Sequence, residues 1–535
     1  MINPKILLKN STATLRILSV VFLLYSCNDA HKEFQDIGTD EFLLLEMDIE
    51  TLQKAYQQGT LSVQEVISLY IRRIEMIDAE GPALNAILSL NPDALSIAEV
   101  LDQELSEGLI RGPLHGVPVI LKDNIDTYDK MPTTAGSRAL TNSFPLADSY
   151  VAEKLRDAGA VILGKANLSE WANFRGEQST SGWSGLGGQT RNPFVLNRNP
   201  CGSSSGSAVA VSANLSMFAI GTETNGSIIC PSQANGIVGL KPTLGLISRR
   251  GIIPIAYNLD VAGPMTRTVR DAAIVLGALA GEDAADETTL TGEGKYWDDY
   301  TPFLNPDGLQ GKKIGFFTGV SGINNKVDEL MQGAVTYMES QGAEIIKVDQ
   351  LSAPGTSAYA FQVMLYEYKD GLNRYFASLG EDAPIKNLEE LIAFNNEDSL
   401  SMSFYNQAYL EMAQAKGDLN SADYLLSLRE MQLGARENGI DKVMNQYELD
   451  AIIAPSGSPA WFTDYVNGDC YRMGSSSPAA HAGYPSITLP MGFVEDMPVG
   501  ISIFGRAWSE PVLLEIAYAY EQGTAHRKVP RFLAH

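Results

Sequence analysis

Short apolar runs alternate with amphipathic segments through most of this 535-residue chain, and this alternation constrains the fold more than any other feature. Residues 118–121 and 160–164 have the composition of buried strands, whereas residues 93–106 and 149–158 have the periodicity of helices. Strands that alternate with helices are typical of a sheet with helices packed against it. The pattern therefore predicts one layered α/β domain with a mostly parallel sheet.

The other predicted elements continue this alternation up to a long helical stretch. Residues 356–446 are strongly helical, and we expect them to form a cap over one end of the sheet. No Pro- or Gly-rich linker interrupts the chain, so we expect one domain over residues 46–535. Further strands are expected at 84–90, 217–221, 312–317, 344–348, 451–454, 486–490 and 500–505, and further helices within 49–77 and at 208–213, 325–341 and 510–522.

The first 27 residues differ in composition from the rest. Basic residues precede an apolar run, 17–25, that is about half the length of a membrane-spanning helix. The run leads to Cys27, and its last residues resemble the box of bacterial lipoproteins, in which the cysteine is acylated; Tyr25 departs from that pattern. We expect a lipoprotein-type signal peptide over 1–27 with lipidation at Cys27, a tether over 28–45, and export to a membrane of the bacterial cell envelope. Plain secretion and an uncleaved anchor stay open.

Charge and cysteine content narrow the range of partners. A net charge of -25 argues against charge-driven binding to nucleic acid or to an anionic membrane surface. Three cysteines follow residue 27, and their spacing matches no metal site, so no metal is expected. Cys201 and Cys230 flank a serine-rich stretch and could pair, but we favour buried, unpaired side chains for these two.

That stretch, from Pro200 to Ser232, is rich in serine and glycine at both ends and contains no histidine. A serine nucleophile needs a neighbouring base, and an apolar run upstream ends on Lys122. The Asn-Gly turn before Ser227 can align backbone N–H groups toward an oxyanion. These residues suggest serine catalysis driven by lysine. A loop whose serines only cap helices is the competing interpretation.

Several motifs, in a fixed order, resemble the amidase signature family. They include GVPVILKDN (116–124), GSSSGS (202–207), GTETNGSI (221–228), GIVGLKPT (236–243), ILGKANLSEWA (162–172), GPMTRTVRDAA (263–273), GYPSITLPMGF (483–493) and MPVGISIFGR (497–506). The resemblance covers nearly all of the chain after the signal segment. It implies a mixed, mostly parallel β-sheet covered on both sides by helices (α/β/α), and hydrolysis of a carboxamide to carboxylate and ammonia.

Residue by residue, the resemblance implies a Ser-Ser-Lys triad. Ser227 matches the acylated nucleophile, Ser203 the bridging serine that the family holds with a cis peptide bond, and Lys122 the terminal base. The family's oxyanion hole falls on the backbone N–H groups of Thr224, Asn225, Gly226 and Ser227. Burial would let Lys122 become a neutral amine, so that Ser203 could relay the proton of Ser227 to it. No cofactor is implied, because base, relay and oxyanion donors are all protein groups.

Other polar residues near these motifs leave alternatives open. His115 lies close to Lys122 in sequence and His481 close to the last motifs, so a Ser–His arrangement is conceivable. Lys165 and Lys241 also lie in family motifs, where we expect structural roles.

The chain departs from the family around the nucleophile. Family members often read DTGGSIR, whereas this chain reads ETNGSII, so Asn225 replaces a glycine and Ile229 the arginine. The lost cation argues against a small anionic substrate. The motifs CGSSSGS and GLISRRGIIPI (245–255) resemble the peptide amidase branch, whose members hydrolyse C-terminal carboxamides of peptides. A glutaminase like the ammonia-producing component of glutamyl-tRNA amidotransferase and an inactive surface-anchored binding protein are the alternatives. The expected partner is a small-molecule or peptide amide, with no nucleic acid.

Overall fold

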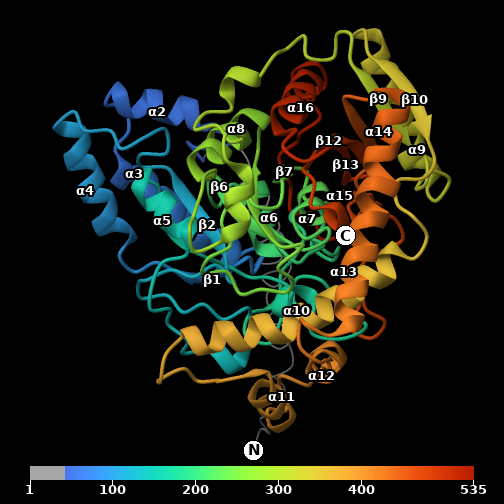
Figure 1. The fold of residues 1–535 in the computed structure, drawn as a ribbon. Helices are drawn as coiled ribbons and strands as arrows, with labels where there is room; N and C mark the ends of the chain where they lie inside the picture. The colour runs from blue at the N-terminus through green and yellow to red at the C-terminus, as the bar shows by residue number, and fades with distance from the viewer. Residues whose placement is uncertain (1–41) are drawn as a thin grey trace, which may run out of the picture.

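The computed structural model describes residues 42–535. The predicted signal sequence, with Cys27, lies outside this range. One sheet of 11 strands runs through the described chain in the order β1-β3-β2-β6-β8-β7-β12-β13-β11-β9-β10, and β4 pairs with β5 in a small separate hairpin (Figure 1). The strands are β1 Ile87–Leu90, β2 Pro118–Lys122, β3 Val161–Ala166, β4 Trp183–Ser184, β5 Gly188–Gln189, β6 Phe218–Glu223, β7 Val238–Lys241, β8 Val261–Thr266, β9 Lys313–Phe317, β10 Glu344–Val348, β11 Ala451–Pro455, β12 Ser486–Val494 and β13 Met497–Phe504.

Parallel pairing occurs in two blocks of this sheet. β2 runs parallel to both β3 and β6, and β9 runs parallel to both β10 and β11. The pairings between these blocks, from β6 through β8, β7, β12 and β13 to β11, are antiparallel, as is β1 with β3. The predicted α/β class, a mixed sheet covered by helices, is confirmed. Because β2 and β6 are parallel neighbours, their carboxyl ends meet at one edge of the sheet.

Helices pack on the sheet and extend beyond it. They are α2 Ile49–Gln57, α3 Val63–Arg73, α4 Ala94–Ser106, α5 Tyr150–Asp157, α6 Ser205–Ser212, α7 Ile229–Ala234, α8 Val269–Leu279, α9 Asn325–Ser340, α10 Thr356–Ser378, α11 Leu388–Glu397, α12 Ala408–Gln414, α13 Ala422–Ala435, α14 Asp441–Tyr447, α15 Ser477–Ala482 and α16 Glu510–Thr524. Helices α10, α11 and α12 lie at the bottom of Figure 1, below the sheet. Their apolar side chains form a cluster separate from the core around the sheet.

Helix α6 lies at the centre of the molecule. All of its residues, SGSAVAVS, are buried, and it contacts β2, β3, β6 and β8. Its composition explains the complete burial. A helix that is buried all round needs no polar face, and small side chains let the neighbouring strands approach it closely. The helix therefore fixes the preceding serine-rich loop against the carboxyl ends of β2 and β6. Among the helices of residues 42–535, none has the length and apolar composition to cross a bilayer.

Candidate active site

Lys122 is the last residue of β2, and its side chain is completely buried. The strand is apolar up to that point and lies between β3 and β6, so the chain carries the lysine into the interior. Its ammonium nitrogen lies 2.7 Å from Ser203 Oγ, 2.8 Å from Thr222 Oγ1 and 3.2 Å from the Thr222 carbonyl oxygen. Three polar atoms thus surround Nζ, and none of the three is a carboxylate.

Burial sets the charge state of this lysine. Loss of hydration lowers the pKa of Lys122 to about 7, against the opposing effect of the negative charges of Asp260 and Glu223. A lysine in water stays protonated up to a pH of about 10. Lys122 is therefore a neutral amine in a large fraction of molecules near pH 7. As an amine it can donate two hydrogen bonds to Thr222 and accept the proton of Ser203.

Ser203 follows a cis peptide bond with Gly202 and is buried beside Lys122. Glycine is required here, because a Cβ on residue 202 would overlap Ser169 Oγ. The loop is joined to the next motif by a hydrogen bond of 3.1 Å from the backbone N–H of Ser204 to the carbonyl oxygen of Ser227. The cis bond that the family resemblance implies is present. Ser203 itself contacts Lys122, and the residue after it is hydrogen-bonded to Ser227.

Residues 224–227 form a turn between β6 and α7. Gly226 has a φ of +85°, a left-handed conformation that glycine adopts at low cost. Within the described chain, the backbone N–H groups of Thr224, Asn225, Gly226 and Ser227 donate to no other protein group. Successive free N–H groups in such a turn form an anion-binding nest. The turn can therefore bind an oxyanion beside Ser227 Oγ.

Two side chains that the sequence did not single out anchor this turn. Asp260 accepts a hydrogen bond of 2.6 Å from Thr224 Oγ1, and its second oxygen accepts from the backbone N–H groups of Ile255 and Ala256. Glu223 accepts from the N–H groups of Ile228 and Ile229, just after the turn, at 2.7 and 3.0 Å. Carboxylates on both sides thus hold the backbone in place, in addition to raising the pKa of Lys122.

The Asn225 side chain connects the turn to α15. Its amide oxygen accepts a hydrogen bond from Ser476 Oγ at 2.8 Å, and its nitrogen donates to Ser477 Oγ at 3.1 Å. The glycine common in the family could not make this connection. Ser476 and Ser477 lie some 250 positions along the chain from Asn225, so only the fold reveals the contact.

A cavity of about 540 Å³ opens onto these groups. Its lining includes Ser203, residues 224–227 and parts of three other regions: Phe174 and neighbouring residues after β3, Met364 and Tyr409 from the helical region 356–446, and the loop 461–477. The described lining contains one charged side chain, Asp469, and no lysine or arginine.

Cys201 and Cys230 also line this cavity, and they form a disulfide bond with a Cα–Cα distance of 5.9 Å. The expectation of unpaired cysteines is wrong for this pair, because the loop before Ser203 folds back onto the helix that follows Ser227. Cys470 is unpaired and exposed. The bond joins the segment of the bridging serine to that of the nucleophile candidate.

The other histidine and lysine side chains near the family motifs lie in environments different from that of Lys122. His115 is buried against the Leu101 carbonyl oxygen. His481 lies 3.4 Å from Asn225 Nδ2, and burial lowers its pKa to about 4. Neither histidine forms a hydrogen bond with Ser203 or Ser227 in the described structure, so a Ser–His arrangement finds no support. Lys165 Nζ donates to Ile125 O and Thr133 Oγ1, and Lys241 Nζ to Pro242 O, as structural roles require.

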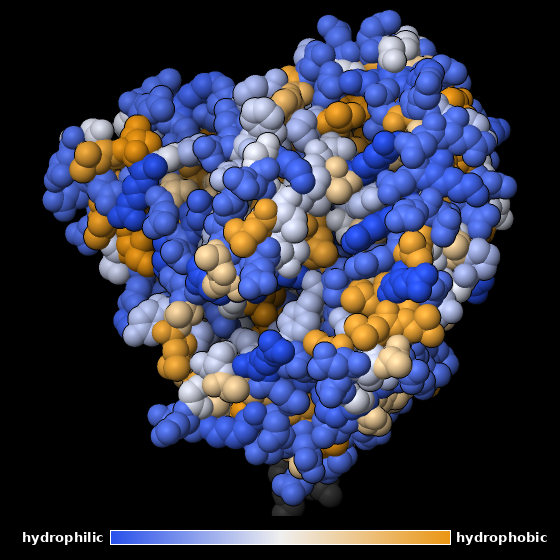
Figure 2. Space-filling model, in the orientation of Figure 1, coloured by the Kyte–Doolittle hydropathy of each residue, from blue (hydrophilic) through white to orange (hydrophobic). Residues whose placement is uncertain are grey.

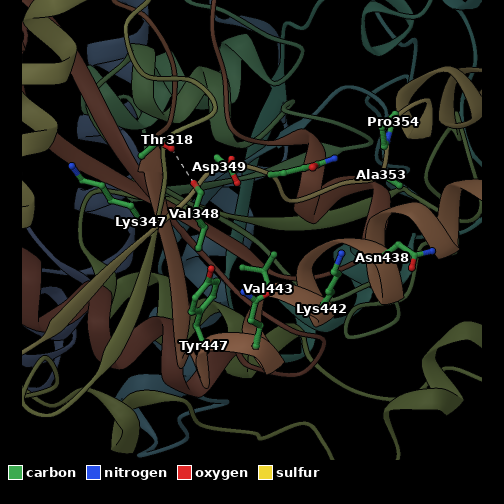
Figure 3. A pocket seen from close by; sticks show the side chains of 12 residues that line it. Thr318, Lys347, Val348, Asp349, Ala353, Pro354, Asn438, Lys442, Val443 and Tyr447 are labelled. Atoms are coloured by element: carbon green, nitrogen blue, oxygen red, sulfur yellow. Dashed lines mark hydrogen bonds between the residues drawn. The ribbon is translucent and has the colours of Figure 1, made fainter.

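A second hollow of about 650 Å³ lies at the carboxyl ends of β9 and β10 (Figure 3). Thr318, Asp349, Lys442 and Tyr447 are among its lining residues, and none of the predicted site residues is. Within residues 42–535, no group of three His, Cys, Asp or Glu side chains could hold a metal ion.

Comparison with known proteins identifies the family of this chain. The amidase family model matches residues 65–514. A probable amidase of Arabidopsis thaliana is 39% identical over 92% of this chain and 93% of its own. Native peptide amidase from Stenotrophomonas maltophilia superposes with a TM-score of 0.88 at 46% identity, over 92% of this chain and 99% of that one. One component of the glutamyl-tRNA(Gln) amidotransferase of Caldanaerobacter subterraneus is 33% identical over 90% of this chain and 96% of its own. The chain thus belongs to the amidase family, whose members are hydrolases of amide C–N bonds.

Proposed function

We propose that this protein hydrolyses the C-terminal carboxamide of peptides to a carboxylate and ammonia, with Ser227 as nucleophile, Ser203 as relay and Lys122 as base. The observation that carries the proposal is the 2.7 Å contact between buried Lys122 Nζ and Ser203 Oγ, beside a cavity that Ser227 lines. The similarity to a peptide amidase at 46% identity supports the choice of reaction.

Acylation uses these groups in sequence. Ser227 Oγ forms a bond to the amide carbon while its proton passes to Ser203 Oγ, and the proton of Ser203 passes to the Lys122 amine. The former carbonyl oxygen takes up the negative charge and accepts hydrogen bonds from the N–H groups of residues 224–227. The C–N bond then breaks. The nitrogen takes the proton back through Ser203 and leaves as ammonia, so that an ester on Ser227 and a neutral Lys122 remain.

Deacylation repeats the path with water. A water molecule gives its proton through Ser203 to Lys122 while its oxygen attacks the ester carbon. Collapse of this second tetrahedral intermediate breaks the bond to Ser227 Oγ, which recovers a proton. The carboxylate product is released.

The charge of the cavity supports a neutral amide as substrate. Free glutamine carries a carboxylate, and the described cavity lining offers no lysine or arginine to pair with it. The oxygens of Asp469 already accept hydrogen bonds from Ser181 and Trp461. Ile229, at the position where the family often has arginine, is buried and carries no charge. A peptide amide is neutral at its C-terminal end and needs no such cation in the cavity.

Ammonia release tests this proposal and separates it from the alternatives. The purified protein should release ammonia from peptide amides without ATP or a partner protein, at a kcat/KM at least tenfold above that for free glutamine. Ser227→Ala should lose this activity, whereas Ser340→Ala, at the exposed end of α9, should keep it. A preference for glutamine would support the amidotransferase-like alternative. Absence of any hydrolysis would support the inactive binding protein.

We also propose that the protein is exported and anchored through Cys27. The disulfide between Cys201 and Cys230 supports this, because disulfides persist in oxidising compartments outside the cytosol. Expression of the full chain with labelled palmitate should give a labelled membrane-bound protein, and Cys27→Ser should remove the label. A wild-type protein that stays unlabelled contradicts the anchor.

A further inference from the structure

Several apolar side chains are exposed in the segments that supply part of the lining of the active-site cavity. Phe404, Tyr465 and Val466 have exposed fractions of 52%, 41% and 84%. We refer to these three residues as the mouth rim. Tyr465 and Val466 stand between Trp461 and Asn467, which both line the cavity, and Phe404 belongs to the segment that leads to Tyr409, another lining residue. The three rim residues are thus close chain neighbours of residues that line the cavity.

The loop that carries Tyr465 and Val466 is firmly held. Asp464 Oδ1 accepts hydrogen bonds from the backbone N–H groups of Val466 and Asn467 at 2.8 and 2.9 Å. The Asp464 carbonyl oxygen accepts from Thr180 Oγ1, and Asp469 accepts from Trp461 Nε1 at 3.1 Å. The backbone at Val466 is thus held by hydrogen bonds on both sides, and the side chain of Val466 is exposed to solvent. This side chain is almost fully exposed and contributes almost nothing to the core.

Contacts between aromatic rings join the two halves of the rim. The rings of Phe404 and Tyr465 have centroids 5.3 Å apart, and Phe404 also packs edge-on against Trp183 at 5.6 Å. The neighbouring Asn406 accepts a hydrogen bond from the backbone N–H of Glu177, next to the cavity-lining Gly176. The helical region and the 461–477 loop therefore meet through the rings of Phe404 and Tyr465.

The size of the cavity determines what the mouth rim contacts in a complex. A volume of about 540 Å³ is in the usual range for one small ligand. It accommodates the carboxamide end of a peptide, whereas residues further upstream must leave through the mouth. We propose that the mouth rim is a second binding site, which selects peptide amides with apolar side chains upstream of the carboxamide residue. This inference rests on the proposed function and adds the class of peptide.

Another exposed apolar surface provides a control. Leu425 and Leu426 on α13 are both about half exposed, and neither lines the cavity. Figure 2 shows a mostly hydrophilic face with an apolar patch at the lower right, in the region of α13. Since this patch is not continuous with the cavity lining, its substitution should not change the choice of substrate.

Kinetics on matched substrates tests the rim. The quantity to measure is kcat/KM of the purified protein for three amides: an N-acetylated amino-acid amide, a tetrapeptide amide with leucine upstream, and the same tetrapeptide amide with serine upstream. Val466→Ser and Phe404→Ser should each lower the ratio of the leucine tetrapeptide to the short amide about tenfold, mainly through KM, because an apolar contact of one side chain is lost. Leu426→Ser should leave this ratio unchanged.

Distinct results overturn the proposal. If the wild-type protein hydrolyses the leucine and serine tetrapeptides equally well, or if both rim variants keep the wild-type ratio, the rim is not a substrate site. If the rim variants change only self-association or binding to lipid vesicles, the rim contacts a second copy or a membrane instead. Failure of the wild-type protein to hydrolyse even the short amide refutes the proposed function itself, and the rim inference with it.

Discussion

Lys122 occupies a position where a charge is costly, and this cost gives the residue its proposed role. An ammonium without hydration favours loss of its proton, and burial lowers the pKa of Lys122 to about 7. Only the neutral amine has a lone pair that can accept the proton of Ser203, which lies 2.7 Å away. The pH at which the lysine loses its proton should therefore control the activity.

The first prediction concerns this pH dependence. The value of kcat/KM for a peptide amide should fall about tenfold per pH unit below an apparent pKa near 7, because Lys122 becomes protonated there. Lys122→Met should lose activity by at least a thousandfold at every pH, since no base remains. Rates measured from pH 4.5 to 9 check both expectations. A flat profile in the wild-type protein, or substantial activity in the variant, would show that Lys122 is not the base.

Asp260 offers a second test at the same scale. Its negative charge favours the protonated form of Lys122, and its carboxylate holds Thr224 Oγ1 at 2.6 Å. In Asp260→Asn the charge is gone, and the amide oxygen can still accept a hydrogen bond from Thr224 Oγ1. The amide nitrogen, however, cannot accept from the N–H groups of Ile255 and Ala256 as the second carboxylate oxygen does. The pKa of Lys122 should fall, and the acid limb of kcat/KM should shift to lower pH. A shift to higher pH, or an unchanged limb, contradicts this electrostatic role.

The loop that precedes α6 and the helix α7 are joined covalently by Cys201 and Cys230. A disulfide across a sequence separation of 29 restricts the unfolded chain, and loop-closure entropy gives roughly 3–4 kcal/mol for a loop of this length. The double variant Cys201→Ser/Cys230→Ser should lower the free energy of unfolding by about that amount in urea titrations. Cys470→Ser, at the exposed unpaired cysteine, is the matched control and should unfold like the wild-type protein. Equal stability of all three proteins refutes a stabilising role for the bond.

The elements differ in how well the sequence predicts them. Strands β2, β3 and β6 are uninterrupted buried runs, and the sequence predicts all three. It predicts neither β7 nor β8. β7 has only four residues, and β8 contains Pro264, which pairs with Ile220 although proline is rare inside sheets. Tertiary contacts with β6 and β7 on either side outweigh this local preference. The sequence predicts the hairpin of β12 and β13 only as two shorter strands, because Gly492 and Pro498 interrupt the apolar pattern.

The residues of the site also differ in how well the sequence predicts them. Lys122, Ser203 and Ser227 lie in short motifs, so local sequence was enough to nominate them. Asp260 and Ser476 act on the same turn from distant parts of the chain, and no local pattern marks either one. The sequence therefore predicts the groups proposed to react but not the groups that position them. The sequence could not decide on the disulfide either, because pairing depends on the distance between the two cysteines, which only the fold determines.

At the scale of the whole molecule, the cavity forms where three separate parts meet. The sheet and α6 position the serines and Lys122, the helical region 356–446 contributes Met364 and Tyr409, and the 461–477 loop forms the remaining wall. The reacting groups thus belong to the sheet and its adjoining loops, whereas much of the wall around them comes from the two other parts. Differences in substrate should accordingly arise from the helical region and the loop, which can change without disturbing Lys122 and Ser203.

Covalent labelling tests the central claim, that Ser227 is the nucleophile, most directly. The purified protein is treated with a fluorophosphonate, digested, and mapped by mass spectrometry. A single adduct on Ser227 is predicted, with loss of labelling in Ser227→Ala and strongly slowed labelling in Lys122→Met. An adduct on Ser203 or on any other serine of the wild-type protein, with Ser227 unmodified, would contradict the account.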